Sequence, residues 1–104
     1  MSPIVRLTLF KIPDPAVVQQ AVQKYSTLYQ EALKDGKPYI QISAGHVTHS
    51  DPHSRGYTFV ARTVFLSKED MDYYDEKDEK HGEIKSLLKG KVEEGPPVVV
   101  CMDG

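Results

Sequence analysis

Three histidines lie close together in the middle of the chain, at His46, His49 and His53. Imidazoles spaced three and four residues apart can share a metal ion when a helix places them on one face. The segment 45–56 that contains them is rich in Gly, Pro, Ser and Asp, which is typical of a turn or a long loop. It has no Cys, and Asp51 is its one further ligand type, so we expect no metal and no cofactor.

Arg6 is a more unusual candidate, because it lies in an apolar segment that reads as a strand. A guanidinium on the inner face of a strand must be paired or solvated. Two interpretations stay open. Arg6 binds a carboxylate or phenolate of a ligand at the mouth of a cavity, or it reaches a rim and pairs with an acid across a dimer.

Cys101 is the single cysteine, and it lies in the apolar run 98–102. No neighbouring residue in the sequence would activate its thiol, so we expect it to be buried and inert. A lone cysteine forms no internal disulfide, which suits a reducing compartment such as the cytoplasm.

These side chains must be positioned by strands and helices that the pattern of apolar residues predicts. Runs of β-branched and aromatic residues predict four strands. Asp14 and Pro15 predict the start of a first helix, and Ser67 caps a second helical region that the charged stretch 75–80 or Gly82 interrupts. The predicted strands are 4–12, 39–44, 57–65 and 98–102, and the predicted helices are 14–34 and 67–89.

The resulting order, βαββαβ, predicts a ferredoxin-like α+β fold with a four-stranded antiparallel sheet and helices on one face. The strands at 4–12 and 57–65 carry apolar residues on both faces, although the helices cover only one. An exposed apolar sheet predicts a partner, and a homodimer that packs sheet against sheet into a barrel is the simplest arrangement.

Length and charge restrict the remaining classes of protein. A chain of 104 residues fits one domain, residues 1–104. The net charge of -2 gives no basic surface for nucleic acid. The apolar runs fall short of the roughly 20 residues that span a membrane, and the N-terminal residues lack the pattern of a signal peptide, so we expect a cytoplasmic protein.

The segment Gly56–His81, GYTFVARTVFLSKEDMDYYDEKDEKH, resembles the stress-responsive dimeric α/β-barrel (Dabb) family. The resemblance rests on a Gly-Tyr-Thr strand ending in Phe, a helix that starts at Ser, a Tyr and then a His. The first strand with its Phe10-Lys11 ending and Gly45 also fit. The family implies the same fold and a homodimer.

Olivetolic acid cyclase, a plant polyketide cyclase, is an enzyme to which the chain shows distant similarity. The resemblance implies His81 as a general base and Tyr74 as its partner on the substrate oxygen. Such a base removes a proton beside a carbonyl and starts an aldol-type ring closure. This chain has one residue more between Tyr74 and His81 than the cyclase. It carries Arg6 where the first strand of the family usually has a histidine, and Phe59 where the cyclase has a histidine in its third strand. The first-helix tyrosine of the cyclase matches either Tyr25 or Tyr29.

Two functions follow from these residues. In the first, a non-enzymatic dimer binds a small apolar or aromatic ligand between sheet and helices, with Arg6, Tyr25, Tyr29 and Phe59 as ligand-binding residues. In the second, the protein is a cofactor-free polyketide cyclase-like enzyme or lyase with His81 and Tyr74 as catalytic residues. A haem-degrading or quinol-forming monooxygenase, which shares the barrel shape, is a further alternative.

Overall fold

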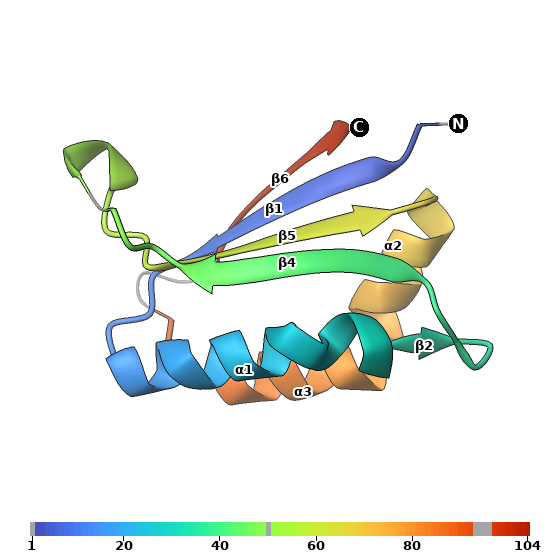
Figure 1. Ribbon diagram of the computed structural model, residues 1–104, viewed down its shortest axis with the longest axis horizontal. Helices are drawn as coiled ribbons and strands as arrows, with labels where there is room; N and C mark the ends of the chain where they lie inside the picture. Colours follow the sequence, from blue (N-terminus) through green and yellow to red (C-terminus); the bar gives the residue numbers. More distant parts are fainter. Residues whose placement is uncertain (1, 50, 93–96) are drawn as a thin grey trace.

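A four-stranded antiparallel sheet packs on a layer of helices in the computed structural model, which describes residues 2–49, 51–92 and 97–104 (Figure 1). The predicted ferredoxin-like α+β fold is confirmed. Among the described residues, no helix is long and apolar enough to cross a membrane. The elements are β1 (Ile4–Phe10), α1 (Pro15–Glu31), β2 (Leu33–Lys34), β3 (Lys37–Pro38), β4 (Ile40–His46), the 3-10 turn η1 (Pro52–Ser54), β5 (Phe59–Phe65), α2 (Lys68–Glu76), α3 (Glu79–Leu88) and β6 (Val98–Asp103).

The strand order β4-β5-β1-β6 places β1 in the middle and β6 at an edge. Arg6 of β1 lies opposite Thr63 of β5 on one side and Cys101 of β6 on the other. Because side chains alternate between the faces of a strand, Arg6, Thr8 and Phe10 point to the face that the helices cover.

Helix α1 covers this face with an apolar stripe. Asp14 caps its first turn by accepting a hydrogen bond from the backbone N–H of Ala16 at 2.9 Å, as the Asp-Pro start predicts. Helix α3 lies beside α1 under the sheet, and α2 lies at one end (Figure 1). The buried residues of α1 are Val17, Val18, Ala21, Tyr25 and Leu28.

The structure differs from the sequence prediction at two helix ends. Helix α1 stops at Glu31, three residues early, because residues 33–38 form a small hairpin whose turn uses positive φ angles at Asp35 and Gly36. The second helical region is broken at Lys77 and Asp78, within the charged stretch, and Gly82 lies inside α3 rather than at the break. A new N-cap at Asp78 determines where α3 begins.

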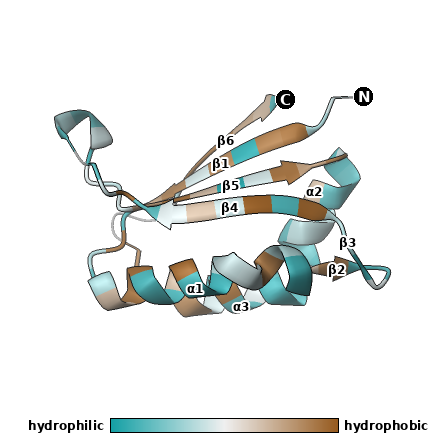
Figure 2. Ribbon diagram, viewed as in Figure 1, coloured by the Kyte–Doolittle hydropathy of each residue, from teal (hydrophilic) through white to brown (hydrophobic). Residues whose placement is uncertain are grey.

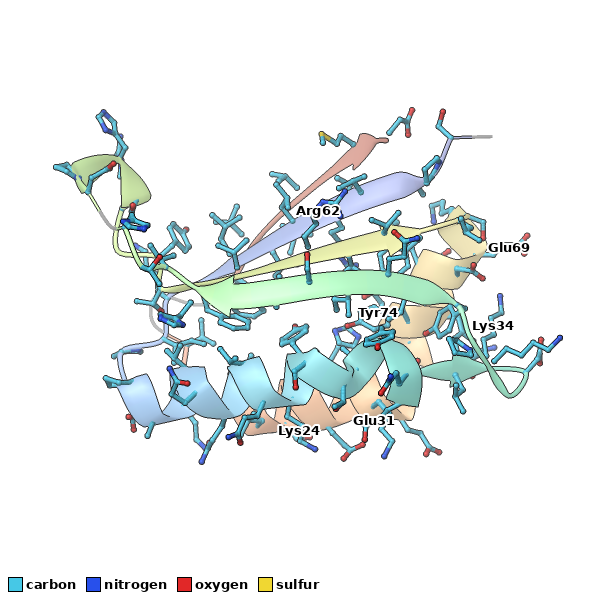
Figure 3. All side chains as sticks on the ribbon, in the orientation of Figure 1. Lys24, Glu31, Lys34, Arg62, Glu69 and Tyr74 are labelled. Atoms are coloured by element: carbon cyan, nitrogen blue, oxygen red, sulfur yellow. The ribbon has the colours of Figure 1, made fainter. Side chains whose placement is uncertain are left out.

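The other face of the sheet carries no helix (Figure 1). Much of β1 and β6 is apolar (Figure 2), and Val100 and Met102 are 51% and 62% exposed. Arg62 projects from this open face, whereas Tyr74 lies between the sheet and the helices (Figure 3). The strand register places the following residues on this open face: Leu7, Leu9, Val60, Arg62, Val64, Val98, Val100 and Met102. They are called the open-face residues below.

Cys101 corrects one prediction, because its side chain is exposed rather than buried. All six residues of β6 are exposed. The reason is that β6 is an edge strand, which has a neighbouring strand on one side only.

Candidate functional site

A cavity of about 770 Å³ lies between the helix-covered face of the sheet and the helices. This volume is in the range of small-molecule sites. One part of its wall is apolar and contains Phe10, Ala61, Ile84, Leu88, Val92 and Val99. The other part is polar and contains Arg6, Thr63, Tyr74, Asp75, His81 and Lys85.

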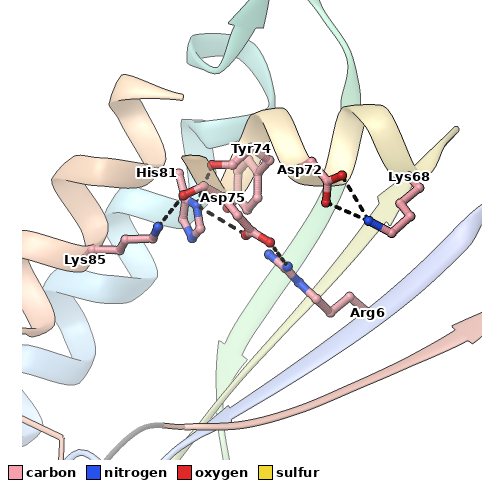
Figure 4. Close-up of polar contacts among 7 residues, drawn as sticks. All are labelled: Arg6, Lys68, Asp72, Tyr74, Asp75, His81 and Lys85. Carbon is pink, nitrogen blue, oxygen red and sulfur yellow. Dashed lines mark hydrogen bonds and ion pairs between the residues drawn. The ribbon is translucent and has the colours of Figure 1, made fainter. Parts of the chain in front are cut away.

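The break between α2 and α3 fixes the orientation of His81. The Tyr73 carbonyl accepts hydrogen bonds from the N–H groups of both Lys77 and Asp78, so the next carbonyl, that of Tyr74, is available to a side chain. His81 Nδ1 lies 2.8 Å from this Tyr74 oxygen (Figure 4). A carbonyl oxygen can only accept, so Nδ1 carries the hydrogen and Nε2 of the neutral ring holds the free lone pair.

His81 is held on a second side by the ring of Tyr74. The two rings stack with centroids 3.8 Å apart and planes 9° from parallel. Burial lowers the pKa of His81 below its ordinary value of 6.5, an effect that the Lys85 charge adds to and that the Tyr74 carbonyl and Asp75 oppose. The imidazole is therefore neutral near neutral pH, the state in which it can take up a proton.

The lowered pKa of His81 predicts a pH dependence of stability. Unfolded His81 binds a proton near 6.5, whereas folded His81 binds it only at lower pH. Between these two values the unfolded state holds more protons, so we expect the free energy of unfolding to fall as the pH is lowered from about 8 to about 5. Urea unfolding should show a smaller fall for His81→Gln and an unchanged fall for His53→Gln, whose side chain is 95% exposed. Equal falls in wild type and His81→Gln would contradict this assignment.

Arg6 lies on the sheet wall of the cavity, opposite the helices that carry His81, and is only 9% exposed. Its Nη1 donates to Asp75 Oδ2 at 2.8 Å, and its Cζ lies 5.0 Å from the Phe65 ring centroid and 5.5 Å from that of Tyr74. Asp75 Oδ1 is also 3.9 Å from His81 Nδ1 (Figure 4). Asp75 therefore lies between the cation and the imidazole.

Asp78 is a site residue that sequence reasoning missed. It is 7% exposed, and its Oδ1 accepts hydrogen bonds from the backbone N–H groups of Lys80 and His81 at 2.9 and 3.1 Å. Its Oδ2 accepts a hydrogen bond from the Tyr39 hydroxyl at 2.6 Å. This carboxylate thus begins α3 and ties the backbone of His81 to the residue that precedes β4. An Asp directly before Glu79-Lys80-His81 is an N-cap signal that could have identified it.

The structure brings some of the predicted site residues together and leaves others apart. Tyr25 lines the cavity with Arg6, Tyr74 and His81, and burial raises the pKa of Tyr25 to about 12 although the Arg6 charge lowers it. Burial likewise raises the pKa of Tyr74 above its ordinary value, so both hydroxyls stay protonated and can donate. Phe59 is fully buried, and its ring packs against that of Tyr25 with centroids 5.4 Å apart.

Tyr29 lies outside the cavity, because it is on the outer side of α1 and 44% exposed. Of the two first-helix tyrosines that the resemblance left open, the cavity contains Tyr25. His46, His49 and His53 are exposed, and no cluster of three metal-ligating side chains occurs in the described part of the chain.

The chain is therefore a ferredoxin-like α+β protein with a cavity whose wall is partly apolar and partly polar. It belongs to the stress responsive A/B barrel domain (Dabb) family, whose model matches residues 4–103. The suggested family is thereby confirmed.

Comparison with known proteins shows one curated relative, a fusaristatin A biosynthesis cluster protein of Gibberella zeae, 35% identical over 83 residues. The match covers 80% of this chain and 60% of the relative, so this chain spans less than two thirds of that protein. A solved structure from Thermobifida fusca, described as a dimeric ferredoxin-like protein of unknown function, is similar with a TM-score of 0.75 and 16% identity over 99% of this chain and 92% of that one. The hydroxynitrile lyase of Passiflora edulis is similar with a TM-score of 0.75 and 14% identity over 99% and 94%.

Proposed function

We propose that the cavity binds a small, largely apolar or aromatic molecule and that His81 acts on it as a general base. The observation that carries this proposal is the hydrogen bond from His81 Nδ1 to the Tyr74 carbonyl, which leaves Nε2 as the basic atom. The lowered pKa keeps that atom free of a proton near neutral pH.

The reaction class that suits this cluster is removal of a proton from a carbon beside a carbonyl. Nε2 takes the proton, and the negative charge moves to the carbonyl oxygen as an enolate. Tyr74 and Tyr25 remain protonated, so their hydroxyls can donate to that oxygen. The enolate carbon then attacks a second carbonyl in an aldol-type ring closure, and the alkoxide that forms takes the proton back from Nε2, which regenerates the neutral imidazole. The same steps in reverse cleave a carbon–carbon bond. His81 and Tyr74 are the proposed catalytic residues, and no cofactor is needed for these steps.

The comparisons are compatible with this proposal. The curated relative is described as part of a biosynthesis cluster, and a hydroxynitrile lyase has the same fold, so this fold can hold an active site. Binding without turnover is the second candidate. Two features support it: His81 is the one histidine that lines the cavity in the described part of the chain, and β1 presents Arg6, a cation that can bind a ligand but is not a base.

The test of catalysis uses 5-nitrobenzisoxazole, a small aromatic compound whose ring opening requires only the removal of one proton by a base. We expect wild type to accelerate the reaction and His81→Gln to abolish most of that acceleration. Wild type that is no faster than free imidazole would favour binding without turnover.

We also propose that two copies pack open face to open face. The open-face residues are mostly apolar, those of β6 are exposed and those of β1 are partly exposed, and several similar structures are described as dimeric. An exposed sheet face with several apolar side chains is typical of an interaction site.

Val100→Glu should weaken or abolish this dimer, because it would place a carboxylate within an apolar interface. Light scattering coupled to gel filtration should then give the mass of one chain at micromolar concentration, against two chains for wild type. Tyr29→Glu is the control, since it adds the same charge at a similarly exposed position on α1, on the other side of the molecule. A wild-type monomer, or an intact Val100→Glu dimer, would refute sheet-to-sheet packing.

A further inference from the structure

We propose that Arg6 makes the cavity selective for ligands that carry a carboxylate beside an apolar body. This inference rests on the proposed binding of a small molecule, but it does not depend on catalysis by His81. It assigns the ligand class from four features of the cavity wall: an unpaired donor, an excess of positive charge, a fixed guanidinium and a weakly held internal acid.

Arg6 has a buried donor without an acceptor. Its Nε is buried and has no hydrogen-bond partner among the residues that the structure describes. Asp75 is bound through Nη1, and Nε belongs to the other edge of the guanidinium, the edge on which Nε and Nη2 form a two-donor fork. A buried N–H that lacks an acceptor is unfavourable, so the cluster is incomplete without a further oxygen.

The charged groups on the cavity wall are mostly cations. Arg6, Lys85 and Lys89 line it, and Asp75 is the one acidic residue of the described lining. The chain as a whole has a net charge of -2, so this local excess of positive charge does not reflect its composition. A cationic wall in a partly apolar cavity attracts an anion and penalises a second cation.

The guanidinium is held in place before any ligand binds. The rings of Phe65 and Tyr74 pack against it, and its side chain is 10% exposed. An Arg that is already ordered loses little side-chain entropy when it binds a carboxylate through two donors.

Asp75 is a poor permanent partner for this guanidinium. Its side chain is 39% exposed, so water competes for its oxygens, and its second oxygen lies 3.9 Å from His81 rather than on Arg6. A ligand carboxylate in the cavity can therefore pair with Arg6 beside Asp75 or in its place, with its apolar body against Phe10, Ala61 and Leu88.

The experiment compares 2-naphthoate with 2-naphthamide, which have the same ring system and nearly the same size but differ in charge. Isothermal titration calorimetry at low ionic strength gives the ratio of the two affinities. We expect wild type to bind naphthoate about tenfold more tightly, and Arg6→Met to bind the two probes equally. Naphthamide binding by Arg6→Met serves as the control that the cavity is intact.

A second pair of variants covers the case in which Arg6→Met does not fold. Asp75→Asn removes the negative charge beside Arg6 that repels a ligand carboxylate and should raise the preference for naphthoate several-fold. Asp72→Asn is the matched control, because it removes the same charge from the same helix while its partner is Lys68 (Figure 4). It should leave the preference unchanged.

A preference that survives Arg6→Met, or that falls in Asp75→Asn, would overturn the proposal, as would a wild type that binds both probes equally. His81→Gln separates this proposal from the catalytic one, since it should keep the preference for naphthoate and lose the ring opening of nitrobenzisoxazole. If it keeps both, His81 is not the base and the carboxylate site stands. If neither probe binds wild type, both proposals fail together.

Discussion

Replacing His81 with Gln is expected to lower kcat/KM for the ring opening of 5-nitrobenzisoxazole by about 100-fold or more, the usual contribution of a positioned base. In this reaction the base removes the proton on the ring carbon beside nitrogen, and the electrons of that C–H bond form the nitrile as the N–O bond breaks. The product is a coloured phenolate, so absorbance follows the rate directly. Gln keeps a polar side chain of similar length but has no basic nitrogen.

The pH dependence of the ring-opening rate should also reflect the pKa of His81. Because burial lowers the pKa of His81, we expect a plateau at neutral pH and a fall only when the pH drops below 6.5, the ordinary value for histidine. His53→Gln, which changes an exposed imidazole, should keep both the rate and its pH profile. If His81→Gln retains the wild-type rate, the reaction occurs elsewhere and the base assignment is wrong.

Replacing Asp78 with Ala is expected to destabilise the protein by about 2–4 kcal/mol, the sum of a lost N-cap and an unpaired buried hydroxyl. The carboxylate accepts hydrogen bonds from the N–H groups of Lys80 and His81 and from the Tyr39 hydroxyl. Urea unfolding measures the loss. Asp72→Ala removes a half-exposed acid whose partner among the described residues is Lys68, and it should cost well under about 1 kcal/mol.

Two further variants separate the roles of Asp78. Asn is a good N-cap residue, so Asp78→Asn should lose less stability than Asp78→Ala. Tyr39→Phe removes the hydroxyl partner, and adding Asp78→Ala to it should cost less than Asp78→Ala alone, because the two residues share one hydrogen bond. Additive losses would show that the Tyr39 contact contributes nothing to the role of Asp78.

Much of the fold could be predicted because local signals and tertiary packing agree. The apolar stripe of α1, the caps at Asp14 and Ser67 and the alternation along β5 all specify elements that the structure contains. The end of α1 could not be predicted, because residues 33–38 are compatible with a helix end and a hairpin alike, and only packing decides between them.

The site was predictable in part. Arg6 was identified because a charge in an apolar strand is costly, and the resemblance to the Dabb family supplied His81 and Tyr74. The roles of Asp75 and Asp78 could not be read from the sequence, because both lie in a charged stretch that is equally typical of a solvated surface. Cys101 was predicted to be buried from its apolar neighbours, whereas exposure in β6 depends on the position of that strand at the edge of the sheet.

The number of residues between Tyr74 and His81, across the junction of α2 and α3, determines how the imidazole is oriented. His81 and the Tyr74 carbonyl that orients it are seven positions apart, across a helix break. One residue inserted or deleted there turns one helix relative to the other by about 100°, unless the break absorbs the change, and separates imidazole from carbonyl. A homologue with the same Tyr and His but a different spacing between them would therefore carry a differently oriented imidazole, whereas length changes around η1 would leave this orientation intact.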